Sequence, residues 1–143
     1  MGETVLKEAT TDEEIERCYD VMAELRTHVE KEKFMPLIRQ MEAQGYRLVF
    51  VEEDGQVVAV AGYRIYTNLI LGKNMYVDDL VTTQKVRSKG NGAKLINWLR
   101  EKAKDSGCSF YHLDSGTERH RAHKFYVSQG FTVSAFHFTE KLS

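Results

Sequence analysis

The sequence has few of the residues that mark specialised protein classes. Among 143 residues there are two cysteines, Cys18 and Cys108, and a single proline, Pro36. The two cysteines suggest neither a disulfide framework nor a zinc site, which favours small core residues and a reducing, cytoplasmic location. One proline argues against a linker between domains, so we expect a single domain over residues 1–143.

Strong net charge and long apolar runs are absent as well. The formal net charge is −1 at pH 7, so no global field attracts nucleic acid or an anionic membrane, and we expect neither as a partner. No apolar run approaches the length of a transmembrane helix, and no signal peptide opens the chain. A content of 42% hydrophobic and 29% charged residues is typical of a globular protein with a substantial core.

The hydrophobic periodicity predicts an α/β fold with a mixed sheet and helices on both faces. Thr11 and Glu14 predict a capping box at a first helix, and Gly45 is expected to end a second. Further helices are expected over 93–104 and 118–128. Strands are expected over 4–10, 46–53, 56–71, 75–82, 108–114 and 131–139. The pair Asp54-Gly55 is typical of a tight hairpin, and the crossover after residue 82 should place strands 75–82 and 108–114 parallel.

A basic loop with two glycines follows the strand over 75–82. It reads Arg87-Ser-Lys-Gly-Asn-Gly92, and the next helix begins at Ala93. Glycine allows the backbone to approach a phosphate closely, and the first N–H groups of a helix attract anions. This pattern is neither a Walker loop nor a dinucleotide fingerprint. An ordinary strand-to-helix turn is the alternative to a phosphate site. The predicted phosphate-binding residues are Arg87, Ser88, Lys89, Gly90, Asn91, Gly92 and Ala93.

Two motifs resemble the GCN5-related N-acetyltransferase (GNAT) family. The first is Arg87-x-x-Gly90-x-Gly92, and the second is Ala122-His-Lys-Phe-Tyr-Val-Ser-Gln-Gly-Phe131. With the element order, the resemblance covers nearly the whole chain. It implies a mixed sheet in which strands one to four are antiparallel, and strands four and five are parallel and splayed apart. It also implies acetyl-CoA as cosubstrate and a homodimer as a partner state.

The resemblance implies roles for individual residues. Tyr126 matches the position that commonly protonates the leaving thiolate, and a phenol with a pKa of about 10 can give a proton to a thiolate. Arg119 stands where the family usually has Asn, so one contact to the pantetheine arm is in question, and contact with the ligand phosphates is the alternative for Arg119. Main-chain N–H groups near Leu80 would polarise the thioester carbonyl. The further residues implied to contact the cosubstrate are Val81, Thr82 and Phe125.

The attacking amine must lose a proton, and Asp78 and Asp79 are the candidate bases, directly or through water. In a regular strand their side chains point to opposite faces, and a bulge would change that. Pairing with a cation such as Arg47 or Arg64 is the structural alternative. His112 is a further candidate, for which a hydrogen-bonded role in the sheet is the simpler interpretation. His120 and His123 lack a third ligand, so we expect no metal.

These observations predict an N-acetyltransferase that moves an acetyl group directly to a primary amine of a small molecule in a ternary complex. No positioned cysteine or serine nucleophile is evident. The C-terminal stretch looks like small bacterial family members that acetylate simple amines, including aminoalkylphosphonate acetyltransferases. A non-catalytic acyl-CoA-binding module or sensor, and an enzyme for another phosphorylated ligand, are the alternatives.

Overall fold

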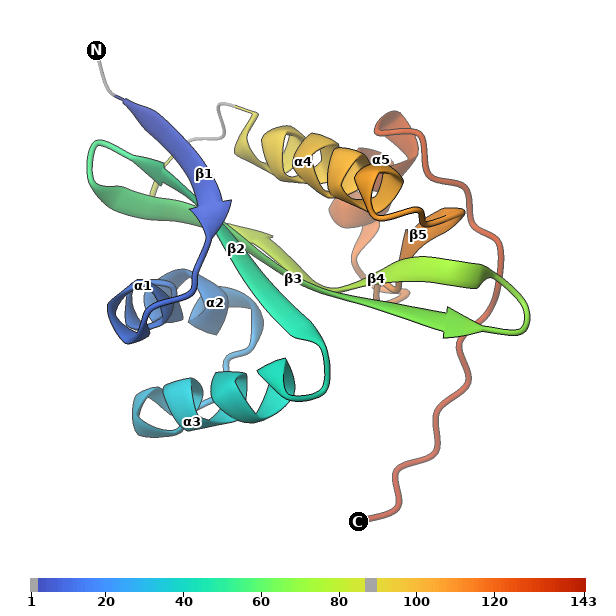
Figure 1. The fold of residues 1–143 in the computed structure, drawn as a ribbon, viewed down its shortest axis with the longest axis horizontal. Coiled ribbons are helices and arrows are strands. Elements are labelled where there is room, and N and C mark those ends of the chain that lie inside the picture. The colour runs from blue at the N-terminus through green and yellow to red at the C-terminus, as the bar shows by residue number, and fades with distance from the viewer. Residues whose placement is uncertain (1–2, 87–89) are drawn as a thin grey trace.

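The structure, a computed structural model, describes residues 3–86 and 90–143 and contains one five-stranded sheet (Figure 1). The strands lie in the order β1-β2-β3-β4-β5, antiparallel from β1 to β4 and parallel between β4 and β5. The relative directions of these five strands are those that the sequence predicted. The strands are β1 (Thr4–Glu8), β2 (Tyr46–Glu53), β3 (Gln56–Asn68), β4 (Gly72–Thr82) and β5 (Phe110–Leu113).

Helices cover both faces of this sheet (Figure 1). On one face, α1 (Asp12–Arg17), α2 (Tyr19–Leu25) and α3 (Lys31–Glu42) bury a core that includes Ile15 and Phe50. On the other face, α4 (Asn91–Asp105) buries Leu95 and Leu99 against β2, β3 and β4. The last helix, α5 (His120–Ser128), follows β5. None of these helices within residues 3–86 and 90–143 has the length and apolar character of a membrane span.

Local signals in the sequence correspond to observed caps and turns. The Thr11 hydroxyl accepts a hydrogen bond from the Glu14 N–H, and the Glu14 carboxylate accepts one from the Thr11 N–H, each at 3.1 Å. This is the predicted capping box. Asp54 and Gly55 join β2 to β3 with φ values of 52° and 79°, the left-handed conformations that a two-residue hairpin requires.

Two expectations about the elements are wrong. The first predicted helix is divided at Cys18 into α1 and α2. The strand predicted over 131–139 does not form, and residues 131–143 adopt no regular element. The composition favours a strand, but a strand also needs a hydrogen-bonding neighbour. The structure of the single chain supplies none to this segment, which we call the C-terminal tail (residues 131–143).

Candidate active site

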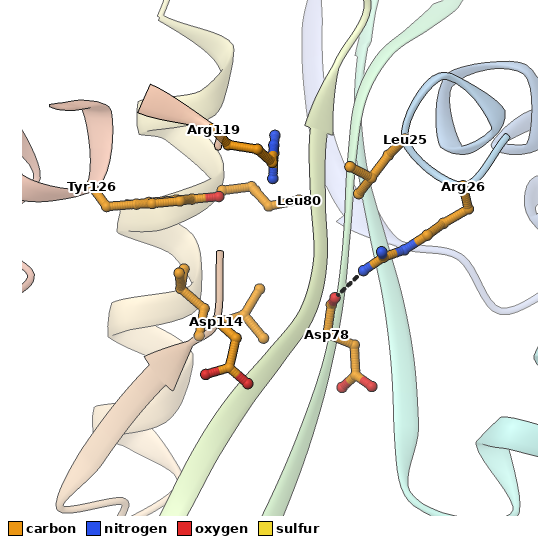
Figure 2. A pocket seen from close by; sticks show the side chains of 9 residues that line it. Leu25, Arg26, Asp78, Leu80, Asp114, Arg119 and Tyr126 are labelled. Atoms are coloured by element: carbon orange, nitrogen blue, oxygen red, sulfur yellow. Dashed lines mark hydrogen bonds between the residues drawn. The ribbon is translucent and has the colours of Figure 1, made fainter. Parts of the chain in front are cut away.

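The strands β4 and β5 separate at their C-terminal ends. Their pairing runs from Asn74 opposite Phe110 to Val77 opposite Leu113, whereas β4 continues to Thr82. The carboxyl ends of parallel strands are a common place for ligand sites. A pocket lies at this separation (Figure 2). Its lining residues come from α2, β4, β5 and the α5 region: Leu25, Arg26, Val77, Asp78, Leu80, Leu113, Asp114, Arg119 and Tyr126.

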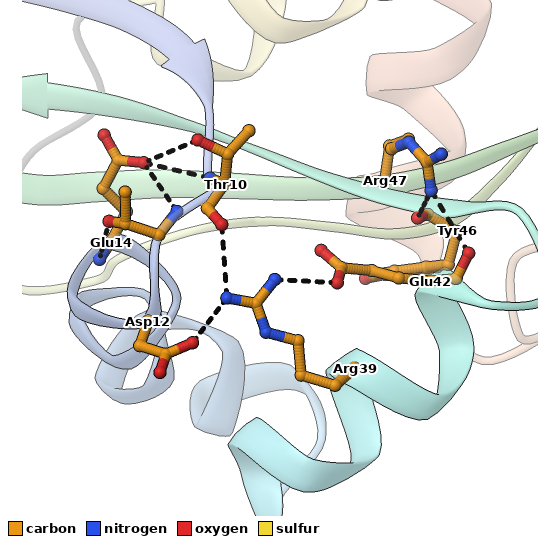
Figure 3. Close-up of polar contacts among 8 residues, drawn as sticks. Thr10, Asp12, Glu14, Arg39, Glu42, Tyr46 and Arg47 are labelled. Carbon is orange, nitrogen blue, oxygen red and sulfur yellow. Dashed lines mark hydrogen bonds and ion pairs between the residues drawn. The ribbon is translucent and has the colours of Figure 1, made fainter.

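A β-bulge in β4 separates the two candidate bases. Asp79 lies opposite Gly62 and Val77 lies opposite Tyr63, so Asp78 is the extra residue. The Asp78 carboxylate accepts hydrogen bonds from Arg64 Nε and Nη2, at 3.1 and 2.8 Å. The bulge is the exception to strand alternation that the sequence left open, and the Asp78–Arg64 pair is the contact named as the structural alternative to a catalytic role. Arg47, the other predicted partner, donates instead to the main-chain carbonyls of Glu42 and Tyr46 (Figure 3).

Of the two candidate bases, Asp78 lines the pocket together with Asp114, whereas Asp79 does not, and the Asp78 side chain is 16% exposed. Burial raises the pKa of this carboxyl group, while the Arg64 guanidinium lowers it in part. A raised pKa suits a group that must take up a proton near neutral pH. The geometry and the electrostatics of Asp78 are therefore compatible with a general base.

The Asp79 carboxylate is held by two protein donors. Tyr46 Oη donates to Asp79 Oδ2 at 2.8 Å, and Arg26 Nε donates to Asp79 Oδ1 at 2.7 Å. Tyr46 is fully buried, and a Cβ added at Gly62 would lie 1.7 Å from its hydroxyl oxygen. Only glycine at position 62 therefore lets the Tyr46 ring reach Asp79. Arg26 also donates from Nη2 to the Asp78 main-chain oxygen at 2.8 Å, which ties α2 to the bulge (Figure 2).

Sequence reasoning did not identify Tyr46, Arg26 or Gly62 as parts of the site. Gly62 carried a usable signal, because an isolated glycine inside a strand often marks a close approach by another group. Tyr46 and Arg26 are polar neighbours of Asp79 only through the tertiary fold, since 33 and 53 residues separate them from it along the chain.

Tyr126 and Arg119 form the opposite side of the pocket (Figure 2). The Tyr126 side chain is 9% exposed. Burial raises the pKa of its phenol, and the charge and hydrogen bonding of Arg119 lower it in part. The phenol thus stays protonated at neutral pH beside a cation that would favour a nearby anion. Both residues were predicted to belong to the site.

Phe125 lies apart from the pocket and packs on the first turn of α4. A Cβ added at Gly92 would lie 3.1 Å from Phe125 Cζ. The absence of a side chain at Gly92 therefore serves helix packing in this structure, in addition to any room that it gives a phosphate. Asn91, beside Gly92, is buried.

The N-terminus of α4 has features of an anion site. Gly90 is the N-cap residue, with a φ of 83°, and among the described residues no side chain caps the helix. The N–H groups of the first turn, from Asn91 to Ala93, therefore lack the side-chain acceptor that usually satisfies one of them. Of the predicted phosphate-binding residues, Arg87, Ser88 and Lys89 lie outside the described residues.

The open edge of β4 presents main-chain groups to the pocket. The Thr83 N–H donates to the Val58 carbonyl of β3 at 2.8 Å. Because every second residue bonds the same neighbouring strand, the main-chain N–H and C=O of Val81 also point toward β3. Alternation in an antiparallel ladder then directs the main-chain groups of Leu80 and Thr82 to the edge that β5 leaves open. An extended ligand with amide and thioester groups would fit along this edge.

The other candidate side chains are engaged elsewhere. His112 Nε2 lies 2.8 Å from Oδ1 of the buried Asn74, so His112 has the hydrogen-bonded sheet role that was the simpler interpretation. His123 Nε2 lies 2.7 Å from the Gly116 carbonyl oxygen. Within residues 3–86 and 90–143, no cluster of His, Cys, Asp and Glu side chains could hold a metal ion.

The residues present fit a thioester carrier. Its diphosphate would meet the N-terminus of α4, and its acyl end would lie near Leu80, between the carboxylate of Asp78 and the phenol of Tyr126. A base candidate on one side of a thioester and an acid candidate on the other is the arrangement of an acyl-transfer enzyme.

Comparison with known proteins identifies the family. The chain belongs to the Acetyltransferase (GNAT) family, whose model matches residues 13–131. It is 32% identical over 135 residues to the uncharacterised N-acetyltransferase YhdJ of Bacillus subtilis, covering 93% of this chain and 95% of that protein. A segment of 66 residues is 32% identical to the aminoalkylphosphonate N-acetyltransferase of Salmonella typhimurium, covering 46% of this chain and 43% of that protein.

The fold has close relatives among solved structures. The aminoglycoside N-acetyltransferase AAC(6′)-Iy, solved in complex with CoA, superposes with a TM-score of 0.88 at 12% identity, over 99% of this chain and 96% of that one. The family resemblance and the splayed mixed sheet predicted from the sequence are thereby confirmed. The chain is an N-acetyltransferase, and acetyl-CoA is the cosubstrate of its family. Family membership thus favours the enzyme over the two alternatives that the sequence left open.

Proposed function

We propose that the chain, as a single domain over residues 1–143, transfers an acetyl group from acetyl-CoA directly to a primary amine of a small molecule. Both substrates are bound together during the transfer. The observation that carries this proposal is the shared pocket of Asp78 and Tyr126, which lies beside the open edge of β4 at Leu80.

The cosubstrate, when bound, supplies the acetyl group as an activated thioester. We assign its diphosphate to the N-terminus of α4, where the peptide dipoles of the helix favour an anion. The Leu80 N–H, at the open edge, is positioned to stabilise negative charge that develops on the carbonyl oxygen. Thr82 offers the next main-chain group along this edge, and Val81 holds β4 against β3. The loop residues assigned to the diphosphate are Arg87, Ser88, Lys89, Gly90, Asn91, Gly92 and Ala93.

Two side chains carry out the proton transfers, one as acceptor and one as donor. Asp78 takes the proton of the attacking ammonium group, directly or through a water molecule, so that the nitrogen lone pair becomes available. As the C–N bond forms and the C–S bond breaks, the Tyr126 phenol gives its proton to the departing thiolate, and the second proton lost by the nitrogen restores the phenol through water. We propose that Arg119, which acts on the same phenol, contacts the thiol end of the cosubstrate rather than its phosphates.

Asp79 has a supporting role in this proposal. Its carboxylate already accepts hydrogen bonds from Tyr46 and Arg26, and those contacts fix the bulge that presents Asp78. Phe125 supports the site from behind, through its packing on Gly92.

Cys18 is not a suitable nucleophile for a covalent acetyl-enzyme intermediate. That side chain is fully buried, and burial raises the pKa of its thiol to about 12. A thiol with such a pKa is overwhelmingly protonated at neutral pH and reacts poorly. This supports direct transfer between the two bound substrates.

The decisive experiment replaces the phenol without changing the ring. Tyr126→Phe is expected to lower kcat about 100-fold, because general acids typically contribute that much or more. The dissociation constant of acetyl-CoA should change less than about threefold. Tyr111→Phe removes another half-buried phenol and serves as the matched control. Equal turnover in Tyr126→Phe and wild type would remove the acid role from this residue.

The acceptor can be found with a panel of small primary amines, measured by release of free thiol. Aminoalkylphosphonates, aminoglycosides and polyamines belong in the panel, with a peptide bearing a free lysine for comparison. Thiol release with a small amine, above the rate with the peptide, is the expected result. Tight acetyl-CoA binding without thiol release for any amine would contradict the proposed activity.

A further inference from the structure

The protein itself neutralises most of the carboxylates around the pocket. The Asp78 carboxylate lies 2.8 Å from Nη2 of Arg64. The Asp79 carboxylate lies 2.7 Å from Nε of Arg26. Asp114 also lines the pocket, but of the residues that the structure describes, no lysine or arginine forms an ion pair with it. Asp114 is therefore a pocket carboxylate without a permanent cation beside it.

Two other groups contact the Asp114 carboxylate. Tyr76 Oη donates to Asp114 Oδ2 at 2.8 Å, and His137 Nδ1 lies 3.4 Å from the same oxygen. The tyrosine is neutral, and the histidine is charged only if it is protonated. The other oxygen, Oδ1, has no hydrogen-bond donor in the described part of the chain, and the Asp114 side chain is 48% exposed. Tyr76 thus fixes the carboxylate and leaves one oxygen available to a ligand.

Asp114 and Asp78 are on the same face of the sheet. Tyr76 is opposite Arg64 in the ladder between β3 and β4, so their side chains project to one face. Tyr76 contacts Asp114 from this face, and the Asp78 carboxylate is bound there by Arg64. In the view of Figure 2 the two carboxylates point to one end of the pocket, and Arg119 lies at the other end. The pocket is therefore negative at the end assigned to the amine and positive at the end assigned to the thiol.

The two carboxylates follow neighbouring strands that diverge. Val77 of β4 and Leu113 of β5 are the last paired residues, and Asp78 and Asp114 come directly after them. Paired strands lie about 4.8 Å apart, so the main chain of Asp78 is at least that far from the main chain of Asp114. An ammonium group at Asp78 therefore leaves room for a second positive group at Asp114.

We propose that the acceptor is a short aliphatic diamine and that Asp114 is the residue that selects it. One amine is placed at Asp78 and is acetylated, while the second stays protonated and binds the Asp114 carboxylate through a charge-assisted hydrogen bond. An acceptor with a carboxylate or phosphonate at its far end would instead place a negative charge beside Asp114, which disfavours it. This inference rests on the proposed function, because it takes Asp78 as the position of the reacting amine.

Three acceptors of similar length and different charge test the selection. They are putrescine, n-butylamine, which lacks the second ammonium group, and γ-aminobutyrate, which has a carboxylate in its place. In the wild type, kcat/KM for putrescine should exceed that for n-butylamine by about tenfold, the low end for a hydrogen bond to a charged group because Asp114 is half exposed. The value for γ-aminobutyrate should be the lowest of the three. Equal values for the three acceptors would overturn the inference.

Asp114→Asn should remove the preference for the diamine. The KM for putrescine is expected to rise about tenfold with little change in kcat, whereas the values for n-butylamine should change less than about twofold. Asp105→Asn, the same change at an exposed position at the end of α4 that does not line the pocket, is the matched control and should keep the preference. A preference for putrescine that Asp114→Asn preserves would contradict the selection by Asp114.

Titration calorimetry separates this inference from the proposed function. With CoA in place of acetyl-CoA no acetyl transfer can occur, so binding of the three amines to this complex reports the subsite alone. The wild type should bind putrescine about tenfold more tightly than n-butylamine, and this comparison requires no variant. Such a preference without thiol release from acetyl-CoA would support the subsite and contradict the proposed activity. Thiol release with no preference for the second ammonium group would support the activity and overturn the inference.

Discussion

The two sides of the pocket are built in different ways. The β4 side consists of the bulge together with α2 and β2, and its carboxylates are paired with Arg64, Arg26 and the buried Tyr46. The α5 side consists of a four-residue strand, a nine-residue helix and the exposed tail. The first side is locked by burial and reciprocal hydrogen bonds. The α5 side, which carries the Tyr126 phenol, consists of shorter elements and is less enclosed by the rest of the protein. Stability should therefore reside mainly in the β4 side.

The largest expected effect comes from Gly62→Ala. The added methyl group would overlap the Tyr46 ring, which cannot move without leaving Asp79. We expect a loss of about 3 kcal/mol in the free energy of unfolding, as for severe overpacking. Urea unfolding followed by circular dichroism measures it. Gly130, at the end of α5, has a φ of 100°, so Gly130→Ala measures the cost of left-handed backbone strain alone, about 1–2 kcal/mol. An equal loss in the two variants would erase the difference between the two sides.

The variants Asp78→Asn and Asp79→Asn distinguish a role in proton transfer from a role in stabilising the fold. Asp78→Asn should lower kcat about 100-fold, because the amide cannot take up the proton, with a smaller effect on unfolding. Asp79→Asn should act mainly on the unfolding free energy, by about 2 kcal/mol, because Tyr46 and Arg26 lose a charged acceptor. Steady-state kinetics and urea unfolding of both variants provide the test. The reverse assignment of the two effects would make Asp79 the base.

The pH dependence should follow from the same carboxylate. Asp78 must be ionised to accept a proton, and burial raises its pKa above the ordinary value for an aspartic acid. The value of kcat/KM is therefore expected to fall as the pH decreases through this raised pKa, and to level off above it. Asp78→Asn should lack that acidic limb. An unchanged limb in the variant would assign the titration to another group.

A smaller effect is expected where α2 meets the loop that precedes α4. Glu24 accepts hydrogen bonds from the Thr83 hydroxyl at 2.6 Å and from the Gln84 N–H at 3.0 Å. Glu24→Gln keeps the shape but weakens these contacts, so the KM for acetyl-CoA should rise about threefold with little change in kcat. Glu16→Gln, on the exposed surface of α1, is the control. If Glu24→Gln changed kcat alone, Glu24 would not act by positioning the segment between β4 and α4 for the cosubstrate.

The sequence predicted the parts of the molecule that depend on local patterns. The strands β1 to β5, the Asp54-Gly55 hairpin and the Thr11 capping box follow from periodicity and turn chemistry. The contact of Tyr46 with Asp79 across Gly62 could not be predicted, since it depends on how distant strands align. The missing strand over 131–139 illustrates the same limit, because composition records a preference for pairing but does not identify the neighbour.

The contact between Gly92 and Phe125 gives Gly92 a second structural requirement, besides the one set by the cosubstrate. Position 92 faces the expected diphosphate on one side, and on the other it supports the helix that carries Tyr126. A library randomised at this codon and selected for acetylation should return glycine even when acetyl-CoA is saturating. Excess cosubstrate can compensate for weak binding, but it cannot realign a displaced phenol.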